Sequence, residues 1–312
     1  MNERKIGIFI SYMNILLQTI INFIYVPILL YYIGKSEYGL YQLIGSFIAY
    51  FSIMDFGLTA AVVRFYTKYK TLNDKISMEN VLAISTRCYA LITLILFIIG
   101  YICYLFLDDI FYNSMTSSEI SSAKNIFILL LLNIVVTIST MIFRAIINAH
   151  EKFLFLKGIE TIQLILQPIL VIVILQEHPY AFSVALVQTV LNIFLSIARC
   201  VYCFRKLKIR IRYHYWDKKL FKEFKKLALS VFAVTLIDQV FFKTNQIILG
   251  IISGTSAVAV YAIASLIYMN YMALSLAMSG VYLPHVTEMI AKRESMKIIS
   301  DLFINIGRWP HF

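Results

Sequence analysis

The chain has 312 residues, of which 60% are apolar and only 14% are charged, and its mean hydropathy is +0.79. A soluble globular protein is typically about 45–50% apolar and about 25% charged, so this composition excludes an ordinary water-soluble domain. The net charge of +11 does not call for a nucleic-acid partner, because most basic residues lie in the connections between apolar segments. We therefore expect a lipid bilayer to be the solvent of this chain.

Eight apolar segments are long enough to cross a bilayer as α-helices. A helical span needs about 20 mostly apolar residues, and in lipid every backbone polar group must be paired within the segment. The short alternating strands of a membrane barrel are not what the sequence shows. We therefore expect an all-α polytopic membrane protein with helices at residues 8–33, 39–66, 81–107, 125–147, 159–176, 180–204, 228–252 and 257–285. The first of these has no small-residue cleavage site after it and is expected to remain as a span.

The distribution of basic residues predicts the orientation of these helices. Of the 28 Lys and Arg residues, 21 fall in the terminal segments and alternate connections on one side, and only Lys35 and Lys124 fall in the connections on the other. Lys and Arg accumulate on the cytoplasmic side of membrane proteins. The sequence therefore predicts that both ends of the chain are cytoplasmic (N-in and C-in).

An internal repeat predicts how the helices are grouped. Ile33–Tyr41 resembles Ser253–Tyr261, which follows 220 residues later and shares its Gly, Ser and Tyr. Each copy joins an outward-going helix to an inward-going one, as in transporters whose two halves share an axis along the membrane normal. We therefore expect a six-helix lobe at residues 1–204, a basic amphipathic cytoplasmic connector at 205–227, and a partial second lobe at 228–312.

The last residues predict an incomplete second lobe. Residues 286–306 have the pattern of an amphipathic lead-in, and the chain stops where a ninth helix is expected to begin. We therefore expect a fragment or a truncated product.

Polar residues within the expected spans recur at spacings of three and four, which places them on one face of each helix. Two interpretations compete. Small polar residues can hold helices together, whereas long amides in hydrocarbon are costly unless they share a wet cavity. The long side chains favour the cavity. The candidate cavity-lining residues are Asn14, Gln18, Tyr25, Gln163, Gln167, Gln188, Asn192 and Asn245.

Five ionisable residues are candidates for binding or coupling. Asp55, Asp238 and Lys243 lie deepest, where a charge costs at least about 2.5–3.5 kcal/mol and needs a partner or water. Arg64 and Arg144 lie near expected cytoplasmic helix ends, where a long side chain can reach the interface. A guanidinium group also suits a phosphate ligand, because its planar fork can bind two oxygens at once.

The sequence carries no recognisable catalytic or metal-binding pattern. It lacks a nucleophile elbow, a Walker-type loop and a zinc-protease motif. The four cysteines, Cys88, Cys103, Cys200 and Cys203, lie in or beside apolar segments and fit small buried residues. We therefore expect no enzyme activity, no metal and no cofactor.

Several segments together resemble a known family. The run Ile33–Tyr41, the motif Asp55-Phe56-Gly57-Leu58 and Arg64 resemble the opening hairpin of oligosaccharide flippases. These are the Wzx-like O-antigen translocases of polysaccharide biosynthesis, within the multidrug/oligosaccharidyl-lipid/polysaccharide exporters. Residues 143–153 and 238–250 resemble the family's fourth and seventh helices. The family has more helices than the eight expected here.

The resemblance implies a function and a set of roles. Such proteins flip undecaprenyl-diphosphate-linked oligosaccharides across the bacterial cytoplasmic membrane by alternating access, for O-antigen (lipopolysaccharide) or capsule synthesis. It implies that Arg64 and Arg144 hold the anionic ligand and that Asp55 couples transport to an ion, while Lys243 (ligand) and Asp238 (coupling) are candidates from their depth. The partners would be the lipid-linked oligosaccharide and membrane lipids, and association with a polymerase and chain-length machinery stays open.

Other classes of protein remain open at this stage. A cation-coupled multidrug exporter would share the fold, and a nonfunctional remnant would explain the abrupt end. A membrane-embedded polymerase or acyltransferase fits less well, because the longest expected outer connection, residues 108–124, is short.

Overall fold

The computed structural model describes residues 3–216, 218–272, 300 and 304, and all regular structure in this part of the chain is helical. Its helices are α1 (Glu3–Phe51), the 3-10 turn η1 (Ser52–Asp55), α2 (Leu58–Thr71), α3 (Lys75–Leu105), α4 (Leu107–Phe111), α5 (Ser117–Ala149), α6 (Phe153–Leu175), α7 (Ala181–Val201), the π-helical turn η2 (Tyr202–Lys206) and α8 (Lys218–Ser253). A further helix, Thr255–Met272, follows α8.

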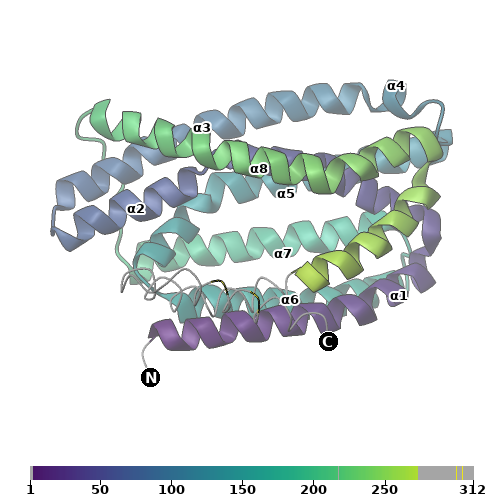
Figure 1. Cartoon of the computed structure of the whole chain (residues 1–312), viewed down its shortest axis with the longest axis horizontal. Coiled ribbons are helices and arrows are strands. Elements are labelled where there is room, and N and C mark those ends of the chain that lie inside the picture. Colours follow the sequence, from purple (N-terminus) through teal and green to yellow (C-terminus); the bar gives the residue numbers. More distant parts are fainter. Residues whose placement is uncertain (1–2, 217, 273–299, 301–303, 305–312) are drawn as a thin grey trace.

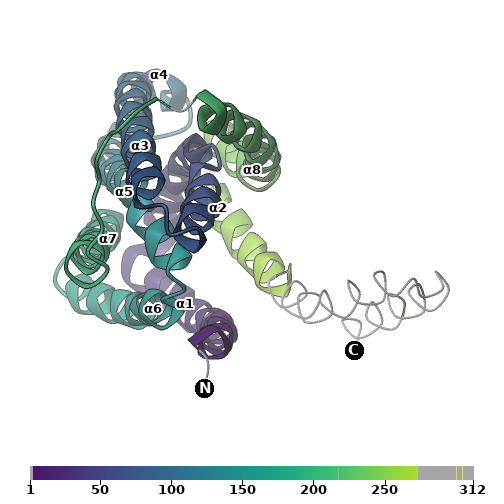
Figure 2. The same ribbon diagram turned by 90° about the vertical axis from the view of Figure 1, so that its left-hand side faces the viewer.

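The long helices run side by side along one axis (Figure 1). Viewed along that axis, α7 and α8 lie on opposite sides of the bundle, with α1, α2 and α5 between them (Figure 2). Six segments of the described chain are long and apolar enough to cross a membrane, and the first of them, Ile10–Thr71, has 62 residues. The expectation of an all-α multi-pass membrane protein is therefore confirmed, while the number of spans and their orientation stay predictions.

Gly34 divides α1 into the first two expected spans. A straight helix of 49 residues would be about 74 Å long at 1.5 Å per residue, far beyond the roughly 30 Å of a hydrocarbon core. Gly34 has φ 74° and ψ 173°, a conformation that glycine adopts without steric cost. Gly254, its counterpart in the repeat, also has a positive φ of 77°. The two copies of the repeat therefore turn the chain with the same backbone device.

The expected continuous helix at residues 39–66 is wrong in one respect. It breaks at residues 52–57, where the chain passes through η1 and then through Phe56 and Gly57, with φ of 48° and 65°. A Cβ atom on Gly57 would lie 2.5 Å from the Cβ of Val231 in α8, so only glycine fits. Two consecutive left-handed residues cannot continue a right-handed helix, and the Asp55-Phe56-Gly57-Leu58 motif therefore forms a turn.

The other expected helices are present, with different ends. The expected outer connection at 108–124 holds α4 and the first turns of α5, whose capping box joins Thr116 and Glu119. Residues 218–227, expected as an amphipathic part of the connector, continue into α8 without a break. The end of the expected helix 257–285 and the lead-in at 286–306 lie outside the described residues, apart from two isolated positions.

One end of the bundle collects the basic connections. The N-terminus and the α2–α3, α5–α6 and α7–α8 connections lie at the same end, on the left in Figure 1. The Gly34 turn, the α6–α7 connection and the Gly254 turn lie at the other end. The basic residues are thus segregated in space, which is the arrangement that the positive-inside rule uses. We call these the basic end and the glycine end.

Candidate functional site

A group of charged side chains lies between α5, α6 and α7 near the basic end. Arg144 Nη2 of α5 donates a hydrogen bond to Glu160 Oε1 of α6 at 2.8 Å, and Lys157 Nζ of α6 donates to Glu160 Oε2, also at 2.8 Å. Arg199 of α7 lies within electrostatic reach of both Arg144 and Glu160. We call Arg144, Lys157, Glu160 and Arg199 the charged cluster.

The charged cluster has more positive charge than its own carboxylate can neutralise. Three cations share the single carboxylate of Glu160, which leaves two positive charges in excess. The Nε atom of Arg199 is buried and has no hydrogen-bond partner in the structure. A buried donor without a partner is costly, and a guanidinium group binds phosphate or carboxylate well. The cluster is therefore suited to an anionic ligand.

The predicted residue Asn14 connects α1 to this cluster. Its Oδ1 accepts a hydrogen bond of 2.7 Å from Thr161, and its Nδ2 donates to the backbone oxygen of Lys157 at 3.5 Å. Thr161 and Lys157 belong to α6, as does Glu160. Asn14 therefore fixes the helix that carries two of the four members of the charged cluster.

Other polar side chains join helices to one another. Asn192 Nδ2 of α7 donates to Asn133 Oδ1 at 2.9 Å and to Thr137 Oγ1 at 2.7 Å, both on α5, and Thr140 of α5 donates to Ser196 of α7 at 3.2 Å. We call these five residues the α5–α7 seam. Interhelical hydrogen bonds of this kind hold membrane helices together. For Asn192, the helix-joining interpretation therefore has direct structural support.

Asp55 stands at the end of η1 and is hydrogen-bonded on one oxygen. Thr59 Oγ1 and the Tyr89 hydroxyl each donate to Asp55 Oδ1 at 2.9 Å, and the two hydroxyl oxygens are themselves 2.9 Å apart. Tyr89 comes from α3 and is buried. The carboxyl group thus joins the turn at residues 52–57 to α3, an arrangement that suits either a structural bond or a proton-binding group.

The remaining predicted residues are dispersed. Tyr41 donates a hydrogen bond to Gln188, joining α1 to α7, and Asn245 donates to the Tyr261 hydroxyl at 2.9 Å. The Tyr25 hydroxyl is buried and has no partner in the structure. The others make no printed contact with the charged cluster: Gln18, Arg64 and Asp238 are exposed, and Gln163, Gln167 and Lys243 are half-buried.

The second lobe meets the first at the glycine end. Ser36 Oγ lies 2.6 Å from Glu119 Oε1 and 2.8 Å from Thr255 Oγ1, and Thr255 donates to the same Glu119 oxygen at 3.1 Å. A Cβ atom on Gly39 would lie 1.9 Å from the backbone oxygen of Thr255, so the two backbones are in close contact. We call Ser36, Glu119 and Thr255 the closed end.

Some contributors were not singled out by the sequence. Tyr89 is an ordinary apolar-helix tyrosine by pattern, and nothing in its neighbourhood signals that it faces Asp55. Lys157 was assigned to a connection but lies within α6, and it shares Glu160 with Arg144. A signal for the cluster did exist, since Arg144, Glu160 and Arg199 all lie on the polar faces of their helices at the basic end. Among the described residues there is no group of three or more metal-binding side chains.

Solved structures with a similar fold include several transporters. The inward-facing conformation of a multidrug resistance MATE family transporter of the MOP superfamily aligns with a TM-score of 0.67 and 14% identity, covering 89% of this chain and 63% of that one. A MOP superfamily transporter from Pyrococcus furiosus, for which reversed polarity of the binding pocket suggests a different function, aligns with a TM-score of 0.57 and 12% identity, covering 91% and 71%. The MATE multidrug transporter DinF-BH gives 0.58 and 15%, covering 89% and 61%.

At these identities the likeness shows the fold alone, and this chain spans 63% of the length of the first of these transporters. No curated protein sequence matches the chain. The family model described as polysaccharide biosynthesis protein matches residues 5–290, which is most of the chain. The chain therefore belongs to the polysaccharide biosynthesis protein family, as a multi-pass membrane protein with the fold of the MOP superfamily transporters.

Proposed function

We propose that the chain is a flippase subunit or fragment that moves an undecaprenyl-diphosphate-linked oligosaccharide from the cytoplasmic to the outer leaflet. The family assignment supports a role in polysaccharide biosynthesis. The observation that carries the proposal is the charged cluster, with its two excess positive charges and the unpaired Nε of Arg199. A diphosphate is a compact anion that two guanidinium groups can hold through paired hydrogen bonds.

The positions of the groups favour loading from the basic end. The charged cluster lies near that end, which the positive-inside rule places in the cytoplasm. The closed end lies at the opposite end, where Ser36, Glu119 and Thr255 join the two lobes. This arrangement corresponds to an inward-facing state, which must open at the closed end and close at the basic end to release the sugar outside.

The Asp55 group is proposed as the coupling site. Its carboxyl oxygen accepts two hydroxyl hydrogen bonds beside the left-handed turn at Phe56 and Gly57, and α8 of the second lobe packs against this turn. Phe56 stacks on Phe232 of α8 with ring centroids 5.2 Å apart. Protonation of Asp55 would change its bonds to Thr59 and Tyr89 and so bias the contact between the lobes.

Deletion of the gene in its native cell tests the proposal. We expect lipid-linked repeat units to accumulate on the cytoplasmic side, and complementation by the native gene to restore export. Arg144→Ala should reduce export at normal expression, whereas Lys124→Ala should not, since Lys124 lies in a separate ion pair with Asp108 toward the other end. Unchanged surface polysaccharide after a clean deletion would contradict the proposal.

A cation-coupled exporter of small aromatic molecules is the second candidate. A cavity of about 650 Å³ lies between α8 and helix Thr255–Met272, and its lining includes Phe241, Phe242, Tyr261 and Tyr268. Aromatic faces bind organic cations. Export of a cationic dye that is lost in Tyr261→Ala and kept in Arg144→Ala would favour this candidate over the flippase.

A further inference from the structure

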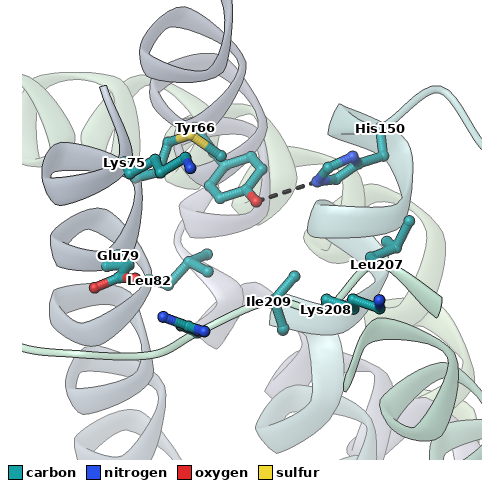
Figure 3. A pocket seen from close by; sticks show the side chains of 10 residues that line it. Tyr66, Lys75, Glu79, Leu82, His150, Leu207, Lys208 and Ile209 are labelled. Atoms are coloured by element: carbon teal, nitrogen blue, oxygen red, sulfur yellow. Dashed lines mark hydrogen bonds between the residues drawn. The ribbon is translucent and has the colours of Figure 1, made fainter. Parts of the chain in front are cut away.

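A second basic cavity lies outside the charged cluster, beneath the connection between the lobes. It has a volume of about 340 Å³ and lies between α2, α3, the end of α5 and the linker at residues 207–216. Figure 3 shows Tyr66 and His150 pointing toward each other on one side, with Lys75 and Glu79 of α3 opposite and residues 207–209 of the linker along the edge. We call this cavity the linker pocket.

The linker wall of this pocket is held in place by side chains of α3. The backbone N–H groups of His214 and Tyr215 donate to Asn80 Oδ1 at 3.1 and 3.2 Å, and Asn80 is buried. The His214 ring lies 2.9 Å from Glu79 Oε2. Arg87 stacks over the Tyr213 ring, 3.9 Å from its centroid. An extended segment fastened at consecutive residues by α3 side chains gives the pocket a preformed wall.

The lining of the pocket has an excess of positive charge. Lys75, Lys208 and Arg210 line it, and its one carboxylate, Glu79, is already engaged by His214. Lys208 has a φ of 51°, a left-handed conformation uncommon outside glycine, so the linker is held in a strained turn beside the pocket. Three cations around one small cavity, with their carboxylate occupied, make an anion site.

The interior of the pocket supplies a neutral hydrogen-bonding pair. His150 Nε2 and the Tyr66 hydroxyl are 3.1 Å apart. Burial, followed by the charges of Lys70 and Lys152, lowers the pKa of His150 to about 4, so its imidazole is neutral at physiological pH. The depressed pKa reports the positive field around the pocket independently of the three lining cations. Apolar side chains, Met78, Leu82, Leu207 and Ile209, complete the lining.

We propose that the linker pocket binds a phosphate group, at a site separate from the charged cluster. Its cations suit the phosphate oxygens, and its apolar lining suits the carbon skeleton attached to them. Phosphate in this setting has two sources, the headgroup of an anionic lipid of the adjacent leaflet or a free phosphate ion. In either case the bound group would tie the linker to α2, α3 and α5. This inference does not rest on transport of any substrate.

The test uses the full chain, purified in detergent and reconstituted into nanodiscs. Native mass spectrometry measures retention of phosphatidylglycerol from nanodiscs of phosphatidylcholine with phosphatidylglycerol, and inorganic phosphate is titrated as a competitor. The triple variant K75Q/K208Q/R210Q should retain at least about tenfold less phosphatidylglycerol, while K35Q, a charge-matched control at the glycine end, should retain as much as the native chain. Displacement by inorganic phosphate identifies the free ion as the source, and no displacement identifies the lipid.

A variant that gains affinity separates binding from misfolding. Glu79→Gln keeps a hydrogen-bond acceptor for His214 and removes the pocket's negative charge, so it should increase phosphatidylglycerol or phosphate binding several-fold. The pKa of His150, followed by NMR of labelled imidazole, should rise when either probe binds, because an anion stabilises the imidazolium form. Equal binding of both probes by the native chain, the triple variant and Glu79→Gln would overturn the proposal, as would failure of the native chain to bind either.

Discussion

Two carboxylates, Glu119 at the closed end and Glu160 in the charged cluster, have opposite surroundings. Glu119 is surrounded by hydroxyls and one backbone N–H: Ser36 and Thr255 donate to one oxygen, and Thr116 donates its backbone N–H and hydroxyl to the other. Glu160 is surrounded by cations, and one of these, Arg199, keeps an unpaired donor. The first arrangement is complete in itself, whereas the second lacks a negative charge. This difference separates a fastening between lobes from a site for a ligand.

The largest effect is expected from removing the unpaired guanidinium. Arg199→Ala should reduce export at least tenfold, because a hydrogen bond to a charged group contributes about 1.5–3 kcal/mol. Folding should be little affected, since the Nε of Arg199 makes no bond that folding would lose. Complementation of a deletion strain, normalised to membrane-inserted protein, measures the effect. An export level equal to that of the native chain would remove Arg199 from the site.

A backbone contact at the closed end should be the next most sensitive. Gly39→Ala places a Cβ atom where the backbone oxygen of Thr255 lies, and forced overpacking typically costs about 1–3 kcal/mol. We expect the two lobes to separate at this end, as seen by spin-label distances between positions 35 and 256. Gly45→Ala is the matched control, since a Cβ there meets no atom within 4 Å. Equal distances in both variants would contradict a closed contact here.

The α5–α7 seam should respond in stability rather than in transport. Asn192→Ala removes the donor to Asn133 and Thr137, and interhelical hydrogen bonds in membranes contribute on average about 0.6 kcal/mol, with a maximum of about 1.7. Thermal unfolding in detergent should shift down modestly, and export per folded molecule should stay unchanged. A loss of export as large as that of Arg199→Ala, in fully folded protein, would place Asn192 in the ligand site.

The smallest effect concerns pH and the linker pocket. His150 has a pKa of about 4 in the folded chain against 6.5 in its ordinary state, so between these values the unfolded chain binds the extra proton. Stability should therefore fall as pH decreases from about 6.5 to 4, and should level off below that range. His150→Gln should flatten this part of the curve in denaturant titrations. The charged groups around His150 are unchanged in this variant: Lys70, Lys75, Glu79, Lys152, Lys208 and Arg210.

The sequence predicted the helices because span length and hydropathy are properties of each segment alone. It missed the turn at residues 52–57, since that turn depends on Val231 filling the space that a side chain at Gly57 would need. Arg144 was predicted as an anion-binding residue, but its pairing with Glu160 depends on how α5 and α6 are rotated about their axes. The same rotation places Tyr89 on Asp55 and Asn192 on Asn133. Polar stripes thus predict which helix faces meet, but not which groups remain unpaired.

The role of the charged cluster is tested most directly by binding of undecaprenyl diphosphate to the purified full chain. The native chain should bind it, Arg199→Gln should bind at least about tenfold more weakly, and Asn192→Ala should bind as the native chain does. Increasing salt should weaken binding by the native chain more than by Arg199→Gln, because the interaction is ionic. Equal affinities of the native chain and Arg199→Gln, with both correctly folded, would contradict the assignment of this cluster as the anion site.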